Sequence, residues 1–504
     1  MNIREAKEQM KQAVNIYLKK DKYGNYRIPV QRQRPIFLIG APGIGKTAVV
    51  EQIAKELDIG LVSYSMTHHT RQSALGLPFI TKKQYKDKTF DISEYTMSEI
   101  IASVYEVMRQ SGKEEGILFL DEINCVSETL APSMLQFLQY KTFGRHQVPE
   151  GWVIVTAGNP QEFNRSVREF DVVTLDRLKV LNVEPAYPVW RDYAINRGVH
   201  KAILTYLDVK KKDFYLIETT VDGRNYVTAR GWEDLSDAMY LNEECGYPVD
   251  EILIGQFLCN KRIVRDFAAY YDLYMKYRQD YAVQDILSGD SDKQIRNRAK
   301  KAPFDERLSL MGLLLEAMQH EIDDQVETDD ALRALFPVLK EIKTQLTEKS
   351  AQEALSDMMV RTKETLEKQQ AANALSREEK NNCQFIIMAL ENDLHELKRR
   401  NIEDSAQAFA YIKDGFDKQV GQLREQIKNI SGQLHHLFAF VDKTFGDGNE
   451  MLILVTELTV NYNCAKFISR NGCEDYYKFN KKFMLHERNA QLMQELEKLE
   501  AEPQ

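Results

Sequence analysis

One stretch of eight residues constrains this chain more than any other: positions 40–47 read GAPGIGKT. The stretch fits G-x-x-x-x-G-K-[ST], a pattern whose backbone binds phosphate oxygens. The apolar run 35–39 before it is typical of a buried strand, and residues 47–57 after it place apolar side chains on one helical stripe. Strand, glycine loop and helix are the context the pattern needs, because glycines permit the tight turn and the helix N-terminus adds positive partial charge.

The residue types in this loop indicate its chemistry. Lys46 is expected to reach the outer phosphates of a nucleotide, and the Thr47 hydroxyl to bind Mg²⁺. A glycine-rich turn before an ordinary helix is the alternative, and the flanking strand and helix disfavour it. The residues predicted to line the phosphate site are Gly40, Ala41, Pro42, Gly43, Ile44, Gly45, Lys46, Thr47 and Ala48.

A pair of carboxylates forms the second signature. The apolar residues 117–120 predict a buried strand, and Asp121 and Glu122 follow at its end. Open α/β sheets bind ligands at the carboxyl ends of their strands. Asp121 is expected to hold Mg²⁺, directly or through water, and Glu122 to orient and deprotonate the attacking water. Asp-Glu after a strand is common by chance, but together with the upstream loop it indicates hydrolysis.

Two polar residues further along complete the predicted site. Asn159 follows the apolar strand 152–157, and its amide is suited to positioning the water against the terminal phosphate. A turn residue before Pro160 is the alternative reading of Asn159. Arg177, within the segment 175–178, is suited to face a neighbouring subunit and stabilise transition-state charge, and a surface salt bridge is its alternative.

Arg230 stands in the first turn of a predicted helix that Thr228 is able to cap. A positive side chain there opposes the helix dipole, so another role is expected for it. Contact with a nucleotide phosphate is one such role, and pairing with a nearby carboxylate such as Glu233 is the other.

Two hairpins are predicted around these motifs. Residues 76–92 contain two short apolar pieces joined by a lysine-rich connection, which indicates a hairpin insertion or a surface loop. Residues 140–150 indicate a second hairpin that turns at Gly144. The adjacent His68 and His69 point apart in an extended chain, and they are interpreted as polar loop residues rather than metal ligands.

Composition sets the class of protein. A chain of 504 residues, 43% hydrophobic and 28% charged, predicts a globular protein of about three domains. The net charge of −9 argues against an extended nucleic-acid surface. Six scattered cysteines suit a reducing compartment and give no disulfide or metal framework. No apolar signal core or membrane-spanning run is present, so a cytoplasmic protein is expected.

Taken together, these motifs resemble an AAA+ ATPase, and within that group the MoxR-like branch of dynein-related AAA type. The resemblance covers about residues 1–270. It implies a P-loop α/β core with a five-stranded parallel sheet, followed by a helical lid. The segments that carry it are GAPGIGKT at 40–47, ILFLDEIN at 117–124, VPEGWVIVTAGNP at 148–160 and LDRL at 175–178.

The resemblance also implies roles and partners. ATP and Mg²⁺ would bind between adjacent subunits of a homo-oligomeric ring, usually a hexamer. Members of this branch act as chaperone-type motors on protein partners, often with a von Willebrand A-domain protein. By correspondence, Lys46 and Thr47 match Walker A, Asp121 and Glu122 Walker B, Asn159 sensor 1, Arg177 the arginine finger and Arg230 sensor 2. Thr-Ala-Arg at 228–230 departs from the usual Ser-Pro-Arg of sensor 2.

The predicted domains are a nucleotide-binding core at 1–190, a helical lid at 191–275 and a helical C-terminal region at 276–504. Apolar residues from Phe409 to Leu437 recur at steps of three and four, which predicts a coiled-coil-like hairpin at about 380–445 or a self-packed helical bundle. Three glycines at 415, 421 and 432 argue against one unbroken helix there.

Two rival functions fit the same motifs. One is a nucleic-acid-linked NTPase motor using ATP or GTP, for which the basic clusters 210–212 and 261–262 are the candidates. Salt-dependent DNA binding would support it. The other is a nucleotide-gated scaffold with very slow turnover, in which the helical region captures a partner.

Overall fold

The computed structural model describes residues 1–68, 76–85, 88–143, 145–163, 167–168, 170–220, 223–346, 349–371, 376–402 and 404–484. His69 and Gly144, named above, lie outside these residues. The chain divides into two compact units. Residues 1–189 with 359–387 form the sheet unit, and residues 190–358 with those from 388 onward form the helical unit.

The sheet unit contains a five-stranded parallel sheet in the order β2-β5-β8-β1-β9. This confirms the predicted α/β core. The order places β5, β8 and β1 side by side, so the ends of the three motif-bearing strands are neighbours. The strands are β1 (Ile36–Gly40), β2 (Gly60–Ser65), β5 (Gly116–Asp121), β8 (Trp152–Gly158) and β9 (Lys179–Val183).

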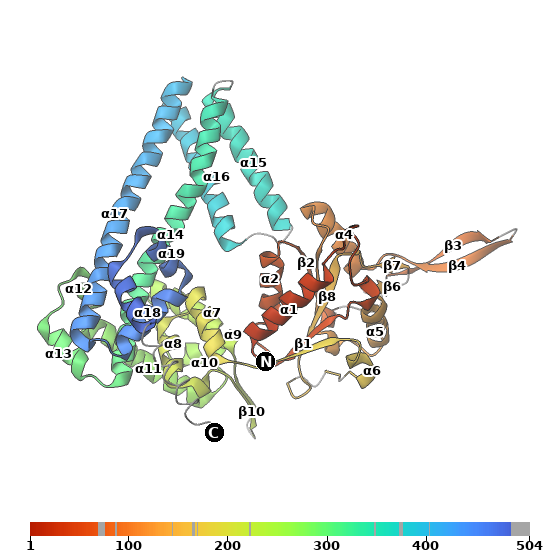
Figure 1. Cartoon of the computed structure of the whole chain (residues 1–504), viewed down its shortest axis with the longest axis horizontal. Helices are drawn as coiled ribbons and strands as arrows, with labels where there is room; N and C mark the ends of the chain where they lie inside the picture. The colour runs from red at the N-terminus through yellow and green to blue at the C-terminus, as the bar shows by residue number, and fades with distance from the viewer. Residues whose placement is uncertain are drawn as a thin grey trace, which may run out of the picture. The chain divides into compact units, whose positions relative to one another are not determined.

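Helices cover both faces of this sheet (Figure 1). Because side chains alternate along a strand, Leu38 packs with the apolar faces of α1 and α2, whereas the neighbouring Phe37 packs with those of α4 and α5. The central strands therefore lie between two apolar cores. The helices are α1 (Ile3–Tyr17), α2 (Lys46–Glu56), α4 (Glu99–Ser111), α5 (Ala131–Tyr140) and the short α6 (Val172–Leu175).

Two antiparallel hairpins project from the sheet unit. β3 (Pro78–Tyr85) pairs with β4 (Lys88–Tyr95), and this hairpin extends away from the sheet (Figure 1). The structure thus favours the hairpin over the surface loop. β6 (Thr142–Phe143) pairs with β7 (His146–Gln147), as the second predicted hairpin requires. Arg145 joins the two hairpins through Glu94, with Nη1 2.5 Å from Oε1.

The helical unit is built around one long helix, α14 (Phe304–Gln345), which packs against α8, α17, α18 and α19. This confirms the largely helical C-terminal region. The preceding stretch was predicted to be helical throughout, but the hairpin β10 (Leu216–Thr220) and β11 (Gly223–Val227) interrupts it. No described helix is both long enough and apolar enough to span a membrane.

Further helices follow β9 in the described part of the chain. They are α7 (Tyr187–Arg197), α8 (Lys201–Val209), α9 (Ala229–Cys245), α10 (Glu251–Phe257), α11 (Lys261–Asp280), α12 (Val283–Ser288), α13 (Lys293–Lys301), α15 (Ala351–Ala371), α16 (Arg377–Arg399), α17 (Ser405–Phe445), α18 (Asn449–Val460) and α19 (Tyr462–Asn471).

Helix α17 is continuous, contrary to the expectation drawn from its glycines. A Cβ atom added at Gly415, Gly421 or Gly432 would meet nothing within 4 Å, so these residues lie on an open side of the helix. A glycine inside a helix costs about 1 kcal/mol relative to alanine. The buried seam, which includes Ile430 and Leu434, outweighs that cost through packing on α14.

Candidate nucleotide-binding site

The loop between β1 and α2 has the geometry that its glycines allow. Gly43 and Gly45 have φ values of +72° and +88°, in the left-handed region that favours glycine. Gly40 is needed for another reason, because a Cβ there would lie 2.4 Å from the main-chain oxygen of Val183 on β9. The close approach of β1 and β9 therefore excludes any side chain at position 40.

Lys46 links this loop to the end of β8. Its side chain is 9% exposed, and Nζ donates hydrogen bonds to the main-chain oxygens of Gly40 (2.9 Å) and Ala41 (2.8 Å). The same Nζ donates to Oδ1 of Asn159 at 2.9 Å. The structure thus brings the predicted phosphate-binding lysine and the predicted water-positioning amide into direct contact.

Thr47 and Asp121 form the second contact of the site. Oγ1 of Thr47 donates to Oδ2 of Asp121 at 3.0 Å, and the main-chain nitrogen of Glu122 donates to Oδ1 of Asp121 at 2.8 Å. A hydroxyl and a carboxylate are oxygen ligands of the kind Mg²⁺ prefers. The two residues predicted to hold the metal therefore fit that ion chemically.

Glu122 adopts an uncommon backbone conformation at the end of β5. Its φ is +54° and ψ +36°, the left-handed region that few non-glycine residues occupy. Oε2 accepts hydrogen bonds from the hydroxyls of Thr67 (3.1 Å) and Ser65 (3.3 Å). Neither hydroxyl was predicted from the sequence. Ser65 is the last residue of β2, which pairs with β5, and Thr67 follows in the next turn, so a polar residue at the end of the strand beside the carboxylate pair is the signal for them.

The carboxylates influence a neighbouring thiol. Burial, assisted by the negative charges of Glu122 and Asp121, raises the pKa of Cys125 above its usual value. The thiol is therefore held neutral, and it does not provide a nucleophile beside the acid pair.

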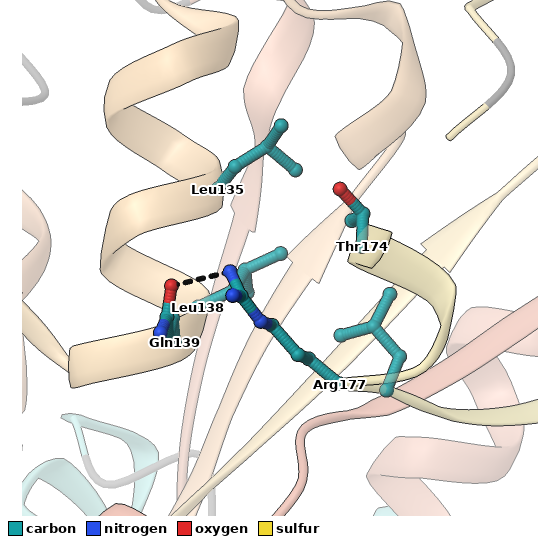
Figure 2. Close-up of a pocket in the computed structure, with 6 residues that line it drawn as sticks. Leu135, Leu138, Gln139, Thr174 and Arg177 are labelled. Carbon is teal, nitrogen blue, oxygen red and sulfur yellow. Dashed lines mark hydrogen bonds between the residues drawn. The ribbon is translucent and has the colours of Figure 1, made fainter. Parts of the chain in front are cut away.

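Arg177 lies apart from these contacts, at a small pocket between α5 and α6 (Figure 2). Its Nη1 donates to Oε1 of Gln139 at 2.6 Å, an amide rather than the carboxylate that a salt bridge requires. Figure 2 shows the side chain extended along this pocket toward α5. The pocket is lined by Leu135, Leu138, Gln139, Thr174, Arg177 and Leu178.

Arg230 belongs to the helical unit, where it is exposed in the first turn of α9. The Thr228 hydroxyl accepts from the main-chain nitrogen of Gly231 at 3.2 Å, which confirms the predicted cap. Glu233, the suggested local partner, instead accepts from Nε1 of Trp190 at 3.0 Å and from the Tyr193 hydroxyl at 3.4 Å. Burial raises the pKa of Glu233.

Strand order, glycine loop and carboxylate pair together define a P-loop nucleotide-binding domain. Residues 35–178 match the AAA domain (dynein-related subfamily). The chain therefore carries an AAA-type ATPase domain of that subfamily, followed by a long helical region. A comparison with curated proteins finds no match.

Proposed function

We propose that the chain is a MoxR-type AAA+ ATPase that hydrolyses ATP with Mg²⁺ to remodel, assemble or mature a protein partner. The observation that carries the proposal is the pair of contacts Lys46–Asn159 and Thr47–Asp121, at 2.9 and 3.0 Å. They join residues of three neighbouring strand ends. Phosphoryl transfer needs this kind of convergence, because its catalysis is positioning and charge stabilisation.

Each residue has a separate task in the proposed reaction. Lys46 exchanges its carbonyl and amide partners for the outer phosphate oxygens of ATP. Thr47 and Asp121 hold Mg²⁺, which supplies positive charge to those oxygens when bound. Glu122 accepts the proton of the attacking water, and Asn159 orients that water.

A ring of identical subunits is the second part of the proposal. Arg177 would act on the nucleotide of a neighbouring subunit, and the surface beside it suits a protein interface. Val172 and Val173 are 81% and 59% exposed, and they lie on α6, the short helix whose Thr174 lines the same pocket as Arg177. Exposed apolar residues near an arginine are typical of interfaces between proteins.

The partner in this proposal is a protein, as the resemblance to the MoxR-like branch suggests, with a von Willebrand A-domain protein as the first candidate. The nucleic-acid alternative has weaker support. In its two basic clusters, Lys210 pairs with Asp266 at 2.8 Å and Arg262 with Asp213 at 2.7 Å. These pairs reduce the charge available to a phosphate backbone.

Steady-state turnover of the full chain with ATP and Mg²⁺ tests the proposal. Lys46→Ala should abolish turnover and weaken ATP binding, whereas Glu122→Gln should abolish turnover and retain ATP, since it removes the base and leaves the phosphate site intact. Lys55→Ala and Glu51→Gln, two exposed changes on α2, serve as matched controls and should keep full activity. Unchanged turnover in Lys46→Ala or Glu122→Gln would reject the site.

Sedimentation with and without ATP tests the ring, and a shift to a larger assembly is expected with ATP. The Glu122→Gln protein, held with ATP, should bind its protein partner more tightly than Lys46→Ala does. Turnover stimulated by DNA would favour the nucleic-acid motor instead.

A further inference from the structure

Asn124 is a buried polar residue that the proposed reaction does not yet use. It lies in the short helix η3 (Ile123–Cys125), two positions after Glu122, and its side chain is 3% exposed. Nδ2 donates a hydrogen bond to the main-chain oxygen of Asn159 at 2.8 Å. The turn after β5 is thereby tied to the residue that follows β8.

The end of β8 is shaped to receive this amide. A Cβ atom on Gly158 would lie 2.4 Å from Oδ1 and 2.7 Å from Cγ of Asn124. Only a residue without a side chain fits there, so the Asn124 amide rests directly on the backbone of β8. On its other side, the main-chain oxygen of Asn124 accepts from the nitrogen of Arg168 at 2.9 Å.

The hydrogen bonding of Asn124 is one-sided. Its Oδ1 is buried, and within the described part of the chain it has no hydrogen-bond partner. An unpaired buried acceptor destabilises a fold, and an apolar side chain of the same size would avoid the penalty. Packing alone therefore does not explain an asparagine at this position, whereas the hydrogen bond from its Nδ2 to the main-chain oxygen of Asn159 does.

We propose that Asn124 is a positioning residue for ATP hydrolysis, acting through Asn159. It fixes the main chain of Asn159, so that the Asn159 amide meets Lys46 and the attacking water while Glu122 approaches from the same β5 turn. Asn159 Oδ1 already accepts from Lys46 at 2.9 Å, so the three residues form one continuous connection. This inference rests on the proposed function and names a further residue of the same site.

Asn124→Asp tests the inference, since it keeps the shape of the side chain and replaces the donor with an oxygen. We expect kcat to fall about 10- to 100-fold, the effect of misplacing one positioning group. The affinity for ATP should stay close to that of the unaltered chain, whereas the buried carboxylate should lower the midpoint of thermal unfolding. Hydrogen exchange of the peptide covering residues 158–163 should become faster without any nucleotide.

A double variant tests whether Asn124 acts through Asn159. Asn159→Ala alone should lower kcat, and adding Asn124→Asp should lower it no further, because the residues act as one unit. The matched control is Thr156→Val, which removes a buried 3.1 Å hydrogen bond from β8 to the main-chain oxygen of Ile36. It should lower the unfolding midpoint and leave kcat unchanged.

The outcomes separate this inference from the proposed function. If the unaltered chain does not hydrolyse ATP, the proposed function fails. If it does, full kcat in Asn124→Asp overturns the inference, and so does a loss of ATP affinity as large as the loss of kcat. Should Asn124→Asp not fold, Asn124→Leu removes the donor with an apolar side chain of similar size, and it must lower kcat at unchanged ATP affinity for the inference to stand.

Discussion

Two buried lysines, one in each unit, have different kinds of partner. Lys46 in the sheet unit bonds to two main-chain oxygens and to the neutral amide of Asn159. Lys201 in the helical unit is 4% exposed and donates to the carboxylate of Glu457 at 2.7 Å. These contacts of Lys46 are with uncharged groups, whereas Lys201 is paired with a carboxylate. A buried lysine thus lies in the phosphate-binding loop of one unit and in an ion pair between helices of the other.

Glu457 shows how the architectural role is achieved. It accepts from Lys201 on α8 and from Arg191 on α7, with the Arg191 contact at 2.5 Å. Burial alone would raise the pKa of Glu457, but the positive charges of Lys201 and Arg191 outweigh it and lower the pKa. One carboxylate on α18 therefore joins helices more than 250 residues away in the chain.

The largest expected effect comes from breaking this pair. Glu457→Gln leaves Lys201 charged and buried without its counter-ion, which should lower the free energy of unfolding of the helical unit by about 3–5 kcal/mol. Because the pKa of Glu457 is lowered, its contribution is present above its unfolded pKa and is lost as pH falls through the folded value. Denaturant unfolding at several pH values measures both, and the acid-dependent part should be absent from the variant.

A double variant tests whether the charged pair of Lys201 and Glu457 is itself required for the stability of the helical unit. Lys201→Met with Glu457→Met replaces both charges by apolar side chains and should recover most of the stability, since Arg191 keeps Asp208 at 2.8 Å. ATP affinity should be unaltered in both variants. If Glu457→Gln cost no stability, the contrast between the two lysines would not hold.

Lys141 sharpens the comparison, because it is a buried lysine of the sheet unit with a neutral partner and no assigned task. It is 1% exposed, its Nζ lies 3.3 Å from Oε1 of Gln33, and burial lowers its pKa to about 7. The unfolded chain then binds one more proton than the folded chain above pH 7. Stability should therefore rise by about 2 kcal/mol from pH 7 to pH 9.

Lys141→Met provides the measurement. Lysine and methionine have the same backbone cost at this residue, whose φ is +56°. Denaturant unfolding of both proteins at pH 7, 8 and 9 should show a rise in the unaltered chain that is smaller in the variant by about 2 kcal/mol. Equal pH dependence in the two would mean that Lys141 stays charged in the folded protein.

The sequence predicted the sheet unit well because its signals are local. A strand, a glycine loop and a helix lie within about 25 residues, and each polar motif directly follows an apolar run. The sequence did not reveal that two hydroxyls donate to the Glu122 carboxylate, since Ser65 and Thr67 are 57 and 55 residues away in the chain. Their contact exists only because β2 and β5 are neighbours in the sheet, and strand order is not written in any local pattern.

The sequence predicted that the second unit is helical, but it did not predict which helices pack against one another. Periodicity found the helix that became α17, yet it did not identify α14 as its packing partner. Lys201 and Glu457 are 256 residues apart, and neither stands in a recognisable motif. The hairpin β10–β11 was missed because the helical pattern on both sides outweighed the Asp222-Gly223 turn signal.

The smallest expected effect concerns the two hydroxyls that donate to the Glu122 carboxylate. It extends the comparison between the two units from lysines to carboxylates. Glu457 is held by two cations, whereas the contacts described for Glu122 are with the neutral hydroxyls of Ser65 and Thr67. Hydrogen bonds of this kind are worth about 0.5–1.5 kcal/mol, so they are readily exchanged when water and ATP enter. Ser65→Ala with Thr67→Val should free the carboxylate and raise basal turnover about two- to fivefold.

Ser63→Ala, on the exposed side of β2, is the control, and steady-state turnover is the measurement. A fall in turnover instead would mean that the hydroxyls place Glu122 for the reaction, so that this carboxylate, like Glu457, depends on its partners to stay in place.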